Sequence, residues 1–159
     1  MTRHAAENGG KRIAVFFYGS FMRREVLARG GFVPETIETA RLGGFDIDCC
    51  PHAYISRSGQ HSIYGVLVSA THQELERLYS MDGVGVFLPE AVLVETSDGG
   101  LRPALCYIPP AHGGKPADPE YVGHLAVAAR AYGFPDWYVA KLAALARPQE
   151  SKTPASAGK

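Results

Sequence analysis

Residues 18–22 carry the most chemical information in this chain: Tyr18, Gly19, Ser20, Phe21 and Met22. They follow an apolar run at 13–17 and precede a polar segment, 23–27, that can begin a helix. A buried strand that turns into a helix through Gly-Ser exposes several backbone N–H groups at one point. Such a point binds carboxylates, phosphates or a developing oxyanion. The alternative is a tight turn in which glycine only supplies an unusual backbone angle.

The three cysteines offer little support for covalent or metal chemistry. Cys49 and Cys50 are adjacent and Cys106 stands alone, so there is neither a disulfide framework nor a CxxC pair. No HExxH motif or histidine-rich tract is present, so we expect no metal. Lone cysteines are usually small buried apolar residues; a nucleophilic Cys106 or Cys49 is the alternative. This cysteine usage fits a reducing, cytoplasmic setting.

The first half of the chain predicts two strands and a short helix around these residues. Residues 13–18 are almost all apolar, as in a strand buried on both faces. A helix over 23–29 is expected to end at Gly30-Gly31. Residues 36–50 contain a further strand, with Gly43-Gly44 at a bend or bulge.

The segment 62–70 predicts a central strand in which Gly65 allows close backbone approach. It continues into Thr71 and Glu74, whose spacing matches the capping box that opens a helix. We expect that helix to end near residues 81–83, with Gly83 in the left-handed cap position.

The second half predicts a hairpin and two helices. Residues 86–96 and 101–108 flank Asp98-Gly99-Gly100, a turn sequence. Asp118-Pro119 begins a helix, and a last helix covers 135–146. The first helix carries an apolar stripe formed by Tyr121, Leu125, Ala128 and Tyr132. The second helix is expected to dock onto the sheet through Trp137 and Tyr138. The mixed order predicts an α+β domain, a small sheet rolled towards a barrel with helices around it.

Composition excludes several classes of protein. The 159 residues predict one domain, 12–146, with disordered tails at 1–11 and 147–159. Lysine plus arginine equals aspartate plus glutamate, 16 each, and no basic stripe appears, so nucleic acid is not the expected partner. No apolar run approaches the ~20 residues of a membrane span, and the polar N-terminus does not indicate export. Nothing in the sequence indicates an oligomeric state.

Three motifs in this order resemble the γ-glutamylcyclotransferase family, which includes γ-glutamylamine cyclotransferases and AIG2-like proteins. They are Tyr18-Gly19-Ser20 after the first strand, the strand at 64–68, and the helix end at 78–83. The resemblance covers about residues 12–108. Residues 51–55 look like the family's substrate loop, and Tyr107 falls where the family often has a tyrosine late in the sheet.

The resemblance implies a six-stranded barrel-like fold with one pocket at the mouth of the sheet, and a reaction without cofactor or metal. The substrate is a small-molecule γ-glutamyl amide, whose free α-amine attacks its own γ-carbonyl. The ring closes to 5-oxoproline and an amine leaves, as in an acyltransferase or lyase. By motif position, Tyr107 lines the pocket, and the loop after Tyr18 (Gly19, Ser20, Phe21 and Met22) supplies the N–H groups for the α-carboxylate and the oxyanion.

The resemblance also assigns Asp82 as general acid/base, with one departure from the family pattern. The family has glutamate there, and a further acid where this chain has Tyr79. Aspartate is shorter by one methylene, roughly 1.5 Å of reach. Asp82 is therefore a working base on a repositioned backbone, a relic in a non-catalytic small-molecule-binding protein, or a cap for Gly83. A third kind of function is amide cleavage with an acyl group other than glutamyl. If Asp82 is not the base, Glu90 is the next acid in sequence.

Four further residues have both a functional and a structural interpretation. Arg23 and Arg24 follow the loop and are candidates to meet a substrate carboxylate, although exposed cations at a helix start are common. His52 is a candidate ligand contact, and Tyr54 is a candidate pocket wall or a structural tyrosine.

Overall fold

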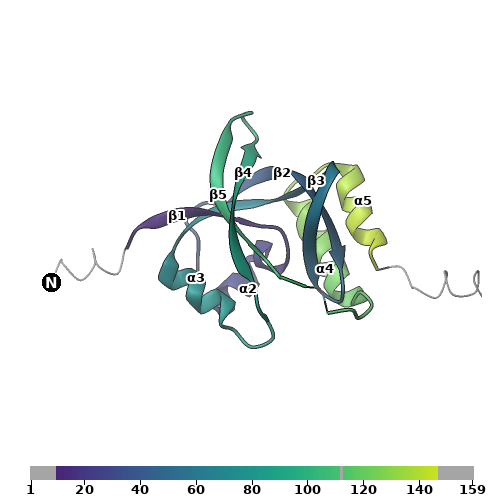
Figure 1. The fold of residues 1–159 in the computed structure, drawn as a ribbon, viewed down its shortest axis with the longest axis horizontal. Coiled ribbons are helices and arrows are strands. Elements are labelled where there is room, and N and C mark those ends of the chain that lie inside the picture. Colours follow the sequence, from purple (N-terminus) through teal and green to yellow (C-terminus); the bar gives the residue numbers. More distant parts are fainter. Residues whose placement is uncertain (1–9, 112, 147–159) are drawn as a thin grey trace, which may run out of the picture.

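A computed structural model describes residues 10–111 and 113–146. The tails expected at 1–11 and 147–159 fall almost entirely outside these ranges. Five strands form a closed barrel in the order β1-β3-β2-β4-β5 within the described residues (Figure 1). Their bounds are Arg12–Phe17 (β1), Glu38–Cys49 (β2), Ala53–Thr71 (β3), Leu88–Thr96 (β4) and Leu101–Ile108 (β5). The helical segments are Ser20–Met22 (η1), Arg24–Arg29 (α2), His72–Tyr79 (α3), Pro119–Ala131 (α4) and Asp136–Ala144 (α5).

The predicted α+β class is confirmed, but the described barrel has five strands where the resemblance implied six. The reason is the length of β3, whose 19 residues pair with β2 along most of their course and with β1 near their end. Sequence analysis predicted only its second half. The barrel closes through a parallel pairing of β1 with β5, Val15 against Leu105 and Phe16 against Cys106. The carboxyl ends of these two strands therefore lie together at one end of the barrel.

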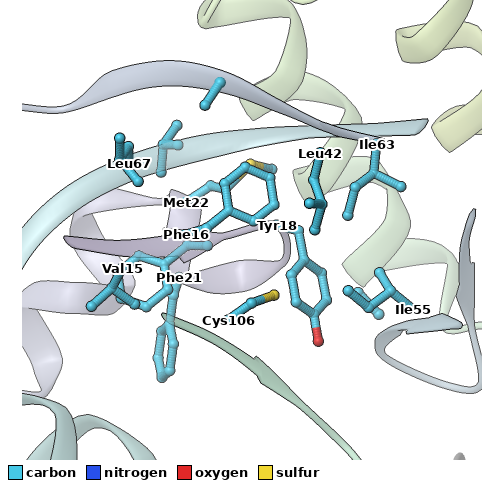
Figure 2. Packing of buried hydrophobic residues seen from close by; sticks show 14 of the residues in the cluster. Val15, Phe16, Tyr18, Phe21, Met22, Leu42, Ile55, Ile63, Leu67 and Cys106 are labelled. Atoms are coloured by element: carbon cyan, nitrogen blue, oxygen red, sulfur yellow. The ribbon is translucent and has the colours of Figure 1, made fainter. Parts of the chain in front are cut away.

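Two glycine predictions are confirmed by the strand register. The pairing of β2 with β3 shifts between Gly43 and Phe45, which is the expected bulge. Gly65 lies where a Cβ would be 2.2 Å from the Phe17 carbonyl oxygen. The missing side chain lets the end of β1 lie close against β3, and the apolar side chains of both strands fill the core shown in Figure 2.

Helix α3 has the capping box predicted from Thr71 and Glu74: each residue's side chain accepts a hydrogen bond from the other's backbone N–H. Its end differs from the prediction. The helix stops at Tyr79, with Ser80 as the C-cap, so Gly83 does not cap it. Helix α3 packs near the end of α2, where Gly30 approaches the Leu78 side chain.

Helices α4 and α5 pack against each other on the side of the barrel formed by β2 and β3 (Figure 1). Asp118 caps α4 and Pro119 begins it, as predicted. In α5, Tyr138 is fully buried, whereas Trp137 is 53% exposed and its ring lies 6.0 Å from that of Tyr64. Both residues therefore contact the sheet residue Tyr64, Tyr138 from a fully buried position and Trp137 from a half-exposed one. None of the described helices is long and apolar enough to cross a membrane.

Candidate active site at the barrel mouth

A cavity of about 750 Å³ opens at the end of the barrel where β1 and β5 finish. Its walls come from the loop after β1, the start of β3, the end of β5, the turn after α3, and helix α4. Of the predicted site residues, six line it: Tyr18, Gly19, Ser20, Phe21, Asp82 and Tyr107. Residues as far apart in sequence as Tyr18 and Tyr107, 89 positions, thus line the same cavity.

The loop after Tyr18 forms one turn of 3-10 helix, η1, with no side-chain cap. Its first hydrogen bond runs from the Met22 N–H to the Gly19 carbonyl, at 2.9 Å. The N–H groups of Ser20 and Phe21 precede this bond in the turn, and that of Ser20 interacts with the Tyr121 hydroxyl. A Cβ on Gly19 would lie 3.2 Å from both the Ala53 Cβ and the Tyr121 hydroxyl, so the loop fits closely against its neighbours.

Met22 does not belong to the cavity, and its prediction as a binding residue is corrected. Its side chain is fully buried in the core (Figure 2). Its N–H is used inside the turn, and its carbonyl accepts a hydrogen bond from the Tyr132 hydroxyl at 2.7 Å. Neither backbone group is therefore free to meet a ligand.

Asp82 lies on a reverse turn rather than on the helix. The Val84 N–H donates to the Met81 carbonyl at 3.2 Å, and Gly83 between them has φ +84°. This positive φ is the backbone conformation that glycine adopts without strain. The Asp82 side chain is exposed to solvent at the cavity wall, and no described residue gives it a hydrogen bond or ion pair. A carboxylate in this setting can accept a proton from a ligand in the cavity.

Tyr18 fastens the loop to the end of β5. Its hydroxyl donates to the Tyr107 carbonyl at 2.9 Å, and only 5% of the residue is exposed. Burial, with the neighbouring Cys106 thiol, raises the pKa of Tyr18 well above its ordinary range. The phenol is therefore a neutral hydrogen-bond donor that holds β1 and β5 together at the cavity.

Aromatic rings form a continuous part of the wall. Tyr79 stacks on Tyr107, with ring centres 4.2 Å apart and planes at 18°. The ring centres of Phe21 and Phe87 lie 5.1 and 5.3 Å, respectively, from that of Tyr79. All four rings line the cavity, and we call them the aromatic wall: Phe21, Tyr79, Phe87 and Tyr107.

Sequence reasoning missed Tyr121, which was assigned only to the apolar stripe of its helix. Tyr121 lines the cavity, and its hydroxyl accepts a hydrogen bond from the Ala53 N–H at 3.2 Å. Burial raises its pKa to about 12, although hydrogen bonding with Ala53 and Ser20 lowers it in part. The candidate His52 lines the cavity and packs on the Tyr121 ring at 4.6 Å. The helical spacing of Tyr121 carries no signal for contacts with residues as far away in sequence as Ala53, 68 positions before it.

The remaining candidates divide clearly. Arg23 lines the cavity and is paired with Glu25 at 3.1 Å, whereas Arg24 and Tyr54 do not line it. Arg29, which the sequence analysis did not single out, also lines it. Glu90 is not part of the cavity; it forms an ion pair with Arg57 and is no substitute for Asp82.

Burial raises the pKa of both Cys49 and Cys106 to about 12, which keeps these thiols neutral and argues against nucleophilic roles. Among the described residues, no group of three or more histidine, cysteine, aspartate or glutamate side chains could hold a metal ion.

The barrel resembles several solved structures. A structure named gamma-glutamyl cyclotransferase has a TM-score of 0.73 at 22% identity, covering 87% of this chain and 90% of that one. YkqA from Bacillus subtilis has a TM-score of 0.71 at 21% identity; 89% of this chain matches 56% of YkqA. An AIG2-like protein from Mus musculus has a TM-score of 0.51 at 14% identity, covering 70% of this chain and 83% of that protein.

No family model and no curated protein matches the sequence. The likeness is therefore one of fold: the chain has the γ-glutamyl cyclotransferase fold, as the motifs in its sequence predicted.

Proposed function

We propose that this chain is an enzyme of the γ-glutamyl cyclotransferase type, which converts a γ-glutamyl amine or peptide to 5-oxoproline and a free amine. One observation carries the proposal: the loop at 19–21 and the Asp82 carboxylate line the same cavity. A reaction of this kind needs both an anion-binding loop and a base, and the fold is that of a protein with this named activity.

The substrate supplies its own nucleophile. Its α-amine nitrogen forms a bond to the γ-carbonyl carbon, and the bond from that carbon to the leaving nitrogen breaks. Over the whole reaction the α-ammonium group loses two protons and the leaving amine gains two, so protons balance without a co-reactant. Because nucleophile and carbonyl belong to one molecule, the site needs chiefly to hold a folded conformer.

Two parts of the cavity then have separate tasks. Backbone N–H groups of the loop at 19–21, that of Phe21 foremost, bind the α-carboxylate or the oxyanion that develops on the γ-carbonyl. Asp82 takes a proton from the α-ammonium and returns one to the leaving nitrogen. Tyr18 and Tyr107 hold the loop and the wall in place through their hydrogen bond. The turn at 81–84, which carries Asp82, lies outside the helix and lines the cavity.

A second candidate is a small-molecule-binding protein without turnover. The exposure of Asp82 and its short side chain favour it, because a general base works best when its position is fixed. It keeps the same cavity and the same loop. The two functions therefore differ in chemistry and not in binding.

The test is an assay of the purified protein with γ-glutamyl amides and γ-glutamyl dipeptides, following 5-oxoproline and free amine. We expect turnover that falls at least about a hundredfold in Asp82→Asn, the usual range for loss of a general acid/base. Glu76→Gln is the matched control, since Glu76 is an exposed acid on α3 that does not line the cavity.

Full activity in Asp82→Asn would exclude the base assignment. Absence of turnover, with a melting temperature that rises on adding one of the compounds, would support the binding protein. Release of amine without 5-oxoproline would indicate amide cleavage of another kind.

A further inference from the structure

The cavity is larger than the γ-glutamyl group. At about 750 Å³ it falls in the range of ~300–1,000 Å³ typical of sites that enclose drug-sized ligands. A γ-glutamyl group is much smaller than such a ligand. The rest of the space is available to the substituent on the leaving nitrogen, so the lining of that space bears on which amine is released.

Apolar side chains near Asp82 in sequence also line the cavity. Tyr79 and Met81 precede it, Val84 and Phe87 follow it, and all four line the cavity. Asp82 is the group that returns a proton to the leaving nitrogen in the proposed reaction, so the substituent begins beside these side chains. It therefore meets the aromatic wall, in which Tyr79 contacts Phe21, Phe87 and Tyr107.

The charges on the cavity do not favour a cationic substituent. Arg29 lines it, as does Arg23, which is paired with Glu25, against the single carboxylate of Asp82. Aromatic clusters also bind ammonium groups through their ring faces. Here Tyr79 and Tyr107 are stacked face to face at 4.2 Å, so each ring covers one face of the other. The wall offers apolar surface and ring edges, which suit a neutral ring in an offset or edge-to-face contact.

We propose that the leaving amine carries an aromatic or comparably bulky apolar group, and that Phe87 and Tyr79 determine this specificity. The inference rests on the proposed function and adds the substrate class. Phe87 is the better probe, because it lies outside the helix and the barrel, on the segment between the turn at 81–84 and β4.

The experiment compares three γ-glutamyl amides with the intact protein: the methylamide, the benzylamide, and the amide of 2-aminoethyl-trimethylammonium. We expect kcat/KM for the benzylamide to exceed that for the methylamide at least about tenfold, an ordinary discrimination for an apolar pocket. The cationic amide is expected to react no faster than the methylamide.

Two variants and a control assign the preference to the wall. Phe87→Ala should lower the benzylamide-to-methylamide ratio about tenfold, and Phe87→Leu, which keeps apolar bulk, should lower it less. Val86→Ala is the control, because Val86 is 70% exposed and does not line the cavity. Its ratio should equal that of the unaltered protein, and melting temperatures verify that each variant is folded.

Equal rates for the methylamide and the benzylamide, or a preference for the cationic amide, would overturn the inference and leave the proposed reaction intact. If no amide yields 5-oxoproline, the proposed function fails on its own. The dissociation constants of the same three amides then test the wall directly. A benzylamide that binds no more tightly than the methylamide would overturn the inference in that case as well.

Discussion

The Tyr121 hydroxyl on α4 accepts a hydrogen bond from the backbone N–H of Ala53, at the first residue of β3, over 3.2 Å. The same hydroxyl is 3.2 Å from the position of a Cβ on Gly19 and interacts with Ser20. One side chain thus joins a helix, the long strand and the loop of the candidate site. Its phenol is neutral over the physiological range, since burial raises its pKa to about 12.

Replacing this hydroxyl should affect the site more than the fold. Tyr121→Phe keeps the ring but leaves the buried Ala53 N–H without its partner, an effect of about 1–3 kcal/mol. We expect kcat/KM for a γ-glutamyl amide to fall at least about tenfold, because the loop loses its support. Tyr64→Phe is the control: the Tyr64 ring packs on Phe134 and Tyr138, away from the cavity. Equal losses in both variants would contradict the positioning role.

Lengthening Asp82 by one methylene tests whether its reach limits the enzyme. The residue is exposed on a turn, so Asp82→Glu should leave the melting temperature unchanged. A misplacement of about 1 Å can cost on the order of a hundredfold in rate. We therefore expect kcat to rise at least about tenfold in steady-state assays of 5-oxoproline formation. A fall in kcat would mean that the turn at 81–84 already suits the shorter side chain.

The features that the sequence predicted correctly are those made by residues close together in the chain. The capping box of Thr71 and Glu74 and the Asp118-Pro119 helix start are made within a few residues, and both were predictable. The end of α3 was not, because the reverse turn at 81–84 competes with a glycine cap. The first half of β3 was missed because its residues 56–62 are largely polar and exposed; the pairing with β2 is interrupted at the bulge and resumes with Phe45 opposite Arg57.

The residues of the candidate site also divide into those with a local sequence signal and those without one. The loop at 18–21 and Asp82 carry recognisable motifs, so their placement in one cavity was expected. Tyr121 and Phe87 reach the cavity only through long-range packing, which no local pattern records. Met22 was included because it adjoins the loop, yet one step along the 3-10 turn directs its side chain into the core.

Substitution of Gly65 tests whether β1 and β3 must approach closely for the barrel to be stable. A Cβ at this position would lie 2.2 Å from the Phe17 carbonyl oxygen, a backbone atom, so Gly65→Ala requires β1 and β3 to separate. We expect a loss of at least about 1–3 kcal/mol in the free energy of unfolding, measured with urea. Gly43→Ala is the matched control, because Gly43 is also a strand glycine and nothing lies within 4 Å of its Cβ position. Similar losses in the two variants would contradict the close approach.

Alkaline pH should destabilise the fold through Cys106. Burial raises the pKa of this thiol from 9.0 to about 12, and the residue is fully buried between β1 and β4. The thiol therefore stays neutral in the folded chain while it ionises in the unfolded chain. Its contribution to stability is complete below pH 9 and is lost as the pH rises from 9 towards 12.

We expect the free energy of unfolding in urea to fall between pH 8 and pH 10, with about 1 kcal/mol of the loss due to this thiol. Cys106→Ala should be less stable than the unaltered protein at pH 8, because it leaves a small cavity. It should nevertheless lose less on going to pH 10, since one of the groups that titrate is gone. Cys49, whose pKa is also raised to about 12, accounts for part of the remaining slope. An identical pH dependence in the two proteins would show that Cys106 is ionised as readily in the folded state as in the unfolded one.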